Sequence, residues 1–421
     1  MPIRLTEGRS SERRSAFRRL PAKLQRRPLT ETCDPRPTRA GTSPNPRRGA
    51  ARRGILPVVV AALLLLAALV GCSPSPTTGE PASASASGTQ AARHEITVVD
   101  DADRKVEITV PVRRVVAFNT FNVEFIRAVG AFDAVVGLDE GSAGENYAGY
   151  WDDFDIAKTA GKGQAEPNYE QLAALKPEVV IFPRNGAWEE AEGKLAAFGI
   201  KTLVITGWDQ NDHVFNVELI GQIFDRQEQA SELNAFYTEY RDLLAERLAG
   251  VTPKRVYLEN DKDFASPVPG SGWHDMVTLA GGTNIFGDIQ FTAADSARGS
   301  VHQLDIDPEA VLDRDPELII RNTGGGYALE SAGDLSAERA NLLGRPGWDG
   351  LTAVRDGQVY TTSSFPMNAC SKIIGSLYVA SWLHPEEMAG VDPDAVMKEW
   401  IETYQGVSLP DPAAYRLHAS A

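Results

Sequence analysis

Hydrophobic and polar positions change their period near residue 114. Before it, Ile96 and Val98 alternate with polar residues, a polar turn follows at residues 100–103, and Val106 and Ile108 resume the alternation. Alternation on both sides of a polar turn predicts a β-hairpin. After it, short apolar runs alternate with runs of helical period: 114–118, 123–129, 134–138, 169–175, 178–182, 189–198 and 202–205. Strands that alternate with crossover helices predict a parallel α/β layer.

A second α/β series follows residue 254. Its runs are 255–258, 274–279, 308–312, 318–321 and 359–362. Between the two series, the spacing predicts one long helix from about Gln227 to Leu248, which Gly250 and Pro253 end. We therefore expect two α/β lobes joined by a single long helix. The predicted parts are an N-terminal lobe at 94–226, a linking helix at 227–250 and a C-terminal lobe at 251–421.

An internal repeat relates the two lobes. Residues 170–181, EQLAALKPEVVI, match residues 309–320, EAVLDRDPELII, with the same spacing from Glu to Pro. Each copy predicts a short helix, capped by Asn168 or Asp307, that ends before a proline and leads into a buried strand. A carboxylate in the first turn of a helix complements its dipole, so Glu170 and Glu309 have either that structural role or a functional one.

The segment before the lobes predicts export. Basic residues precede an uncharged run from Ile55 to Val70, which is short for a membrane span and ends in Leu-Val-Gly-Cys72. This pattern resembles the bacterial lipoprotein signal, which implies that Cys72 is lipidated; the alternative is an ordinary transmembrane helix. We expect residues 1–71 to form an N-terminal extension with a signal peptide. Residues 72–93, rich in Ser, Pro, Ala and Gly, would then be a flexible tether to the extracytoplasmic side of the cell membrane.

Charge and motifs exclude several functions. The net charge is −15, and the first 53 residues are strongly basic, so the remainder carries about −26, which disfavours nucleic-acid binding. No GxSxG, P-loop or HExxH motif occurs, and no two of the six histidines have the i,i+4 spacing of a helical metal site. We therefore predict no catalytic residues, no cofactor and no metal site. Cys370, the only cysteine after Cys72, is predicted to be a buried small hydrophobic residue.

Residues that follow the predicted strands are candidates for ligand contact. In doubly wound sheets, ligands bind beyond the carboxyl ends of the strands. Asn185 and Asn260 follow strands, and the residues that we expect to contact the ligand are Asn119, Phe121, Arg184, Trp208, Trp273, Arg321 and Phe365. Aromatic and polar groups together suit a drug-sized organic ligand or an organic metal chelate. Arg184 and Arg321 follow the two repeated strands, so they could clamp one anionic group from both sides.

Four segments carry a family resemblance. They are residues 114–118 (RVVAF), 167–181 (PNYEQLAALKPEVVI), 349–360 (DGLTAVRDGQVY) and 378–387 (YVASWLHPEE). From about residue 95 to 405 the chain resembles the periplasmic-binding-protein family that serves importers of ferric siderophores, haem and cobalamin. The resemblance implies two Rossmann-like lobes bridged by one long helix, with a ligand cleft between them.

The same resemblance implies a function and partners. In that family a Glu on each lobe meets an Arg pocket on the two permease subunits, and these match Glu170 and Glu309. The implied function is to bind an iron chelate, with a ferric siderophore favoured, and deliver it to an ABC permease dimer with its ATPase. Haem, cobalamin or a bare metal ion, a sensor lipoprotein without an importer, and an enzyme such as a metal chelatase remain alternatives.

Overall fold

The computed structural model describes residues 92–151, 159–290 and 302–417. Contacts divide the chain into units 1–83 and 84–421, and every described residue belongs to the second. The predicted extension, the lipidation site Cys72 and most of the tether lie outside the described residues. Among the helices of the described part, none has the length and apolar character to cross a membrane.

The N-terminal lobe contains the predicted hairpin and a parallel sheet. Strands β1 (His94–Val99) and β2 (Lys105–Val110) pair antiparallel with Ile96 opposite Ile108, which confirms the hairpin. The sheet has the order β4-β3-β7-β8 and is parallel throughout. Its strands are β3 (Val115–Ala117), β4 (Val135–Leu138), β7 (Val179–Phe182) and β8 (Lys201–Val204). Its helices are α1 (Thr120–Ala128), α2 (Glu140–Ala143), α3 (Tyr169–Leu175), α4 (Trp188–Leu195) and α5 (His213–Phe224).

The C-terminal lobe contains a second sheet, with the order β11-β9-β13-β14-β15. The first four strands are parallel and β15, at the edge, is antiparallel. The strands are β9 (Lys254–Asn260), β11 (Gly282–Asn284), β13 (Leu318–Asn322), β14 (Val359–Thr362) and β15 (Arg416–Leu417). The helices are α7 (Gly272–Leu279), α9 (Pro308–Arg314), α10 (Leu335–Leu343), α11 (Thr352–Arg355), α12 (Ser364–Asn368), α13 (Ile373–Leu383) and α14 (Pro393–Glu399). A separate strand pair, β10 (Ala265–Pro267) with β12 (Gln303–Asp305), completes the lobe.

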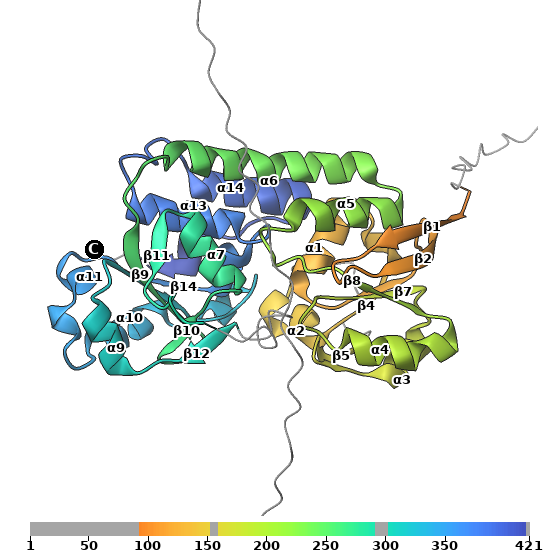
Figure 1. Cartoon of the computed structure of the whole chain (residues 1–421), viewed down its shortest axis with the longest axis horizontal. Helices are drawn as coiled ribbons and strands as arrows, with labels where there is room; N and C mark the ends of the chain where they lie inside the picture. Colours follow the sequence, from red (N-terminus) through yellow and green to blue (C-terminus); the bar gives the residue numbers. More distant parts are fainter. Residues whose placement is uncertain (1–91, 152–158, 291–301, 418–421) are drawn as a thin grey trace, which may run out of the picture. The chain divides into compact units, whose positions relative to one another are not determined.

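The linking helix is α6, Gln227–Arg247, and its predicted start is confirmed. Figure 1 shows it extending over both lobes, with α13 and α14 beside it. The C-terminal segment also reaches the first lobe. Gln405 donates a hydrogen bond to the carbonyl of Glu124 (3.2 Å), and Arg127 donates to the carbonyl of Gln405 (3.1 Å). One hydrophobic cluster contains residues of both lobes, so the linking helix is not their only connection.

The repeat forms the predicted helix and strand in each lobe. Helix α3 ends at the left-handed residue Lys176 before Pro177, and α9 ends at the left-handed residue Asp315 before Pro316. Because proline cannot continue a helix, the chain turns at both points into a strand whose residues are all buried. In Figure 1, α3 and α9 lie on the edge of the molecule opposite α6.

Candidate functional site

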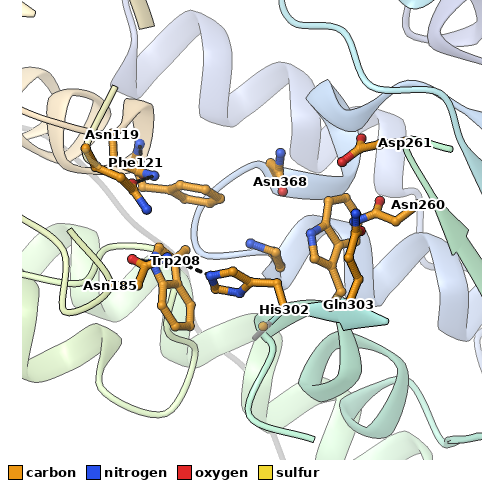
Figure 2. Close-up of a pocket in the computed structure, with 13 residues that line it drawn as sticks. Asn119, Phe121, Asn185, Trp208, Asn260, Asp261, His302, Gln303 and Asn368 are labelled. Atoms are coloured by element: carbon orange, nitrogen blue, oxygen red, sulfur yellow. Dashed lines mark hydrogen bonds between the residues drawn. The ribbon is translucent and has the colours of Figure 1, made fainter. Parts of the chain in front are cut away.

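A cleft of about 640 Å³ lies between the two lobes (Figure 2). The N-terminal lobe contributes Asn119, Phe121, Gln164, Asn185 and Trp208, and the C-terminal lobe contributes Asn260, Asp261, Gly272, Trp273, His302, Gln303, Asn368 and Lys372. The volume lies within the range of about 300–1,000 Å³ that is typical of small-molecule sites. Four of the seven predicted contact residues, namely Asn119, Phe121, Trp208 and Trp273, line this cleft.

Asn119 shows how a strand end positions a cleft residue. It follows β3, has a φ of 78° and caps α1, where its side chain accepts from the N–H of Phe121. Its own N–H donates to Asp139 (2.8 Å), and its amide donates to Gln164 (2.8 Å). These hydrogen bonds hold Asn119 and Gln164 on the side of the N-terminal lobe that lines the cleft.

Aromatic side chains form the walls of the cleft. Phe121 and Trp208 belong to the N-terminal lobe and are almost buried, whereas Trp273 comes from the first turn of α7 in the C-terminal lobe. In Figure 2 the labelled Phe121 and Trp208 project into the space between the lobes. Rings from both sides can contact a flat apolar surface, since aromatic faces bury large areas with few rotatable bonds.

Lys372 lies between the aromatic walls. Its Nζ is 4.2 Å from the centre of the Phe121 ring and 5.3 Å from that of Trp273. The residue is only 3% exposed, and its stem packs against Gly272, where an added Cβ would lie 3.4 Å from Lys372 Cδ and Cε. Burial lowers the pKa of the ammonium to about 7, while the charges of Asp209 and Asp275 oppose this shift.

The loop that carries Lys372 has an unusual backbone. Cys370, Ser371 and Lys372 all have positive φ, at 48°, 50° and 68°. Ser371 donates to the carbonyl of Gly207 and lies 2.8 Å from Nδ1 of the buried His213, so the loop is tied to the N-terminal lobe. The strain of three consecutive left-handed residues is thus retained by contacts from outside the loop. Cys370 is fully buried, as predicted.

Further contacts cross between the lobes. The amide nitrogen of Asn185 is 2.6 Å from Nε2 of His302, and the His302 ring meets Trp208 edge-on at 5.1 Å. Burial, followed by the charge of Lys372, lowers the pKa of His302 to about 4, so its imidazole is neutral at pH 7. Asn211 also donates to Asp275 (3.2 Å). Polar side-chain contacts therefore join the two lobes across the cleft.

The structure does not bring Arg184 and Arg321 into the cleft. Arg184 pairs with Asp209, and with Asp101 and Asp212 at 2.8 and 2.9 Å. Arg321 is buried beside Glu259 and Glu338, at 3.1 Å from each. Carboxylates of the same lobe already neutralise both guanidinium groups, so this arrangement differs from the expected clamp of one ligand group by two arginines.

Phe365 does not line the main cleft. It lines a smaller cavity of about 170 Å³ that shares Asn119, Phe121 and Asn368 with the main cleft. Glu124 also lines this cavity, accepts a hydrogen bond from Tyr150 (2.6 Å) and is held at a pKa of about 7, chiefly by burial. Burial of Glu124 therefore favours its protonated form near neutral pH.

Glu170 and Glu309 are both exposed, and neither lines the cleft. Each follows its capping residue by two positions, and the cap accepts the N–H of the glutamate. The described residues contain no group of three or more His, Cys, Asp or Glu side chains that could hold a metal ion.

Seven lining residues were absent from the candidates that the sequence predicted: Gln164, Asp261, Gly272, His302, Gln303, Asn368 and Lys372. Asp261 directly follows β9 and Gln303 opens β12, so strand ends could have indicated these two. Lys372 gives no such signal, because it precedes a helix and enters the cleft only through the left-handed loop.

Comparisons with known proteins agree with this architecture. The family model described as periplasmic binding protein matches residues 115–365. The chain is 25% identical over 350 residues to the molybdate-binding protein MolA of Haemophilus influenzae, covering 75% of this chain and 93% of that protein. It is 26% identical over 157 residues to the vitamin B12-binding protein of Yersinia pestis, covering 36% of this chain and 51% of that one.

Solved structures share the two-lobed fold. The TroA-like periplasmic binding protein FepB from Veillonella parvula superposes with a TM-score of 0.61 at 24% identity, covering 77% of this chain and 100% of that one. MolA bound to molybdate gives a TM-score of 0.60 at 20% identity, covering 75% of this chain and 99% of that one. At these identities the structural likeness concerns the fold.

Proposed function

The chain belongs to the periplasmic binding protein family, and from that premise we propose that it captures an organic metal chelate for an ABC importer. The ligand that we favour is a ferric siderophore. The protein would deliver it to a permease dimer with its ATPase. Transport of this kind needs no covalent chemistry, and we propose no enzymatic activity.

The cleft is the observation that supports this proposal. A bare ion or oxyanion would fill a small part of about 640 Å³, whereas an organic chelate would reach the aromatic walls of both lobes. Phe121 and Trp208 offer apolar faces from one lobe and Trp273 from the other. Amide groups such as those of Asn119 and Asn185 would orient the ligand through hydrogen bonds. A ligand held by both lobes favours their closed arrangement.

A molybdate-type oxyanion is the second candidate. The similarity to MolA covers most of both chains, unlike the similarity to the vitamin B12-binding protein. An oxyanion would leave the aromatic walls without contacts, which is why we place it second. Haem and a corrinoid fit the aromatic lining as organic chelates and belong in the same panel of ligands.

Docking and anchoring complete the proposal. Glu170 and Glu309 occupy equivalent positions in α3 and α9. Figure 1 shows these two helices on the edge opposite α6. We propose that these carboxylates meet basic pockets on the two permease subunits. Lipidation at Cys72 would keep the protein on the extracytoplasmic face of the membrane, near that permease.

Tryptophan fluorescence tests the proposed function. The purified protein would be titrated with ferric hydroxamate and catecholate complexes, haem, cobalamin, molybdate and free metal ions. Trp208 and Trp273 line the cleft, so saturable quenching by one chelate at sub-micromolar concentration is expected. The Trp208→Phe and Trp273→Phe variants should lose most of that signal. Binding of only molybdate or a free ion would refute the chelate proposal.

A further inference from the structure

The ammonium group of Lys372 is a buried charge that the proposed function leaves unexplained. It lines the cleft between a ring of each lobe, and within the described residues it forms no ion pair within 4 Å and no hydrogen bond. Moving a charge out of water costs several kcal/mol. A well-placed opposite charge can offset a cost of this size. A desolvated cation–π contact returns on the order of 2 kcal/mol, so the rings of Phe121 and Trp273 offset only part of that cost.

Packing alone does not account for this lysine. Its stem fills the space beside Gly272, but an apolar side chain of similar length would do so without the buried charge. The residue is also held at a φ of 68° in a run of three left-handed residues. A strained backbone that places an unpaired cation in a cleft indicates a partner that the protein itself does not supply.

The other groups around Lys372 leave room for an anion. Asp209 and Asp275 favour its charged form from beyond ion-pair distance, and Asn211 already binds Asp275. His302 faces it as a neutral imidazole, as its lowered pKa shows. Among the cleft residues described, Asp261 is the one carboxylate, and its pKa is raised by burial against the opposing effect of Arg321. Most other polar groups of the lining are amides, which accept or donate without adding charge.

We infer that Lys372 binds a negatively charged group of the ligand, so that the cleft selects anionic chelates over uncharged ones. This inference rests on the proposed function and names the charge class of its substrate. The anion would lie between Phe121 and Trp273, which come from opposite lobes. A single ligand group would thus satisfy the buried charge and join the two lobes.

The inference makes affinity depend on pH. With a pKa near 7 in the free protein, Lys372 is mostly charged at pH 6 and mostly neutral at pH 8.5. An anion binds the charged form better, so binding above pH 7 takes up a proton. Affinity should then fall by up to about tenfold for each pH unit above 7.

The experiment compares ligands of different charge on three proteins. A ferric tris-catecholate complex is strongly anionic, a ferric tris-hydroxamate complex can be chosen uncharged, and molybdate is a small anion. Wild type, Lys372→Gln and Lys176→Gln would be titrated with each ligand from pH 6 to 9. Lys176 is the matched control, because it also has a positive φ (48°) but is exposed and lies outside the cleft.

We expect Lys372→Gln to weaken the catecholate complex at least tenfold at pH 6.5 and to abolish the pH dependence, with Lys176→Gln unchanged. Lys372→Arg should retain the preference for the anion without titrating in this range, because arginine stays charged. Calorimetry of wild type in buffers of different ionisation enthalpy should show proton uptake at pH 8. This measurement needs no variant, so it serves even if Lys372→Gln fails to fold.

The outcomes separate this inference from the proposed function. If no chelate binds, the proposed function fails. If charged and uncharged chelates bind alike, without proton uptake, the function stands and the role of Lys372 is overturned. If only molybdate binds, with proton uptake and loss in Lys372→Gln, the anion site stands and the chelate is excluded.

Discussion

Glu170 and Glu309 occupy the same position in two helices of different lobes. Each is the second residue of its helix, and its N–H donates to the cap side chain two residues earlier, at 3.1 Å in α3 and 3.0 Å in α9. The helix dipole accounts for an acidic residue at either place. It does not require both helices to lie on one edge of the molecule, as they do in Figure 1.

Charge reversal at these two positions should separate uptake from binding. We expect Glu170→Lys with Glu309→Lys to reduce ligand uptake by cells more than tenfold, because two contacts with the permease would become repulsive. Ligand affinity of the purified protein should not change. Glu228→Lys is the control: Glu228 is also exposed and second in its helix, but it lies in α6 on the opposite edge. Equal uptake by all variants would contradict the docking role.

Glu124 should make the free energy of unfolding depend on pH. Its pKa is about 7 in the folded protein against an ordinary value of 4.5, so it contributes stability below pH 4.5 that is lost as pH rises to 7. Glu124→Gln should match wild type near pH 4 and be more stable at pH 8, by up to about 3 kcal/mol. Denaturant unfolding at several pH values measures this difference. Asp101 and Asp275 also have raised pKa values. Their contributions to the pH dependence of unfolding are the same in wild type and variant, so they cancel in the difference.

Arg321 should matter for stability and not for ligand affinity. The Arg321→Met variant leaves fully buried Glu259 with one guanidinium partner, Arg345, so we expect a loss of about 3–5 kcal/mol. Arg255→Met, which breaks exposed ion pairs with Asp315 and Glu317, should cost less than about 1 kcal/mol. Unfolding curves and ligand titrations of both variants test this. A weaker affinity in Arg321→Met would instead support the clamp predicted from the sequence.

Trp273 should contribute strongly to ligand affinity. Its ring is the main aromatic surface that the C-terminal lobe presents to the cleft, and we expect Trp273→Ala to weaken chelate binding by about 10- to 100-fold. Trp382→Ala is the comparison, because Trp382 stacks on Tyr360 (4.3 Å) in the same lobe without lining the cleft. That variant should lose stability and keep its affinity. Calorimetric titration measures the affinity of both variants, and denaturant unfolding measures their stability.

The fold was largely predictable because its periodic elements are strong. The run 359–362 is the whole of β14, and the predicted helix from Gln227 begins where α6 begins. The repeat predicted two capped helices and the strands that follow them, as observed. Buried parallel strands and capped helices are determined by near neighbours in the chain, and the sequence shows these directly.

The site was less predictable because it depends on distant contacts. Strand ends indicated Asn119 and Trp208, and both residues line the cleft. They could not indicate that Arg184 would be neutralised by three aspartates, one of them Asp101 from the hairpin turn. Nor could they indicate Lys372, whose direction depends on backbone dihedral angles that no local pattern in the sequence reveals.

The C-terminal contacts have a consequence for the order in which the molecule is made. Phe125 packs edge-on against Trp400, with ring centres 6.4 Å apart, and Glu124 binds Gln405 through its carbonyl. A ribosome adds these partners more than 270 residues after α1. Part of the apolar surface of the N-terminal lobe is therefore uncovered until the C-terminal segment leaves the ribosome. A chain truncated before Trp400 should expose that surface and be a substrate for chaperones and proteases.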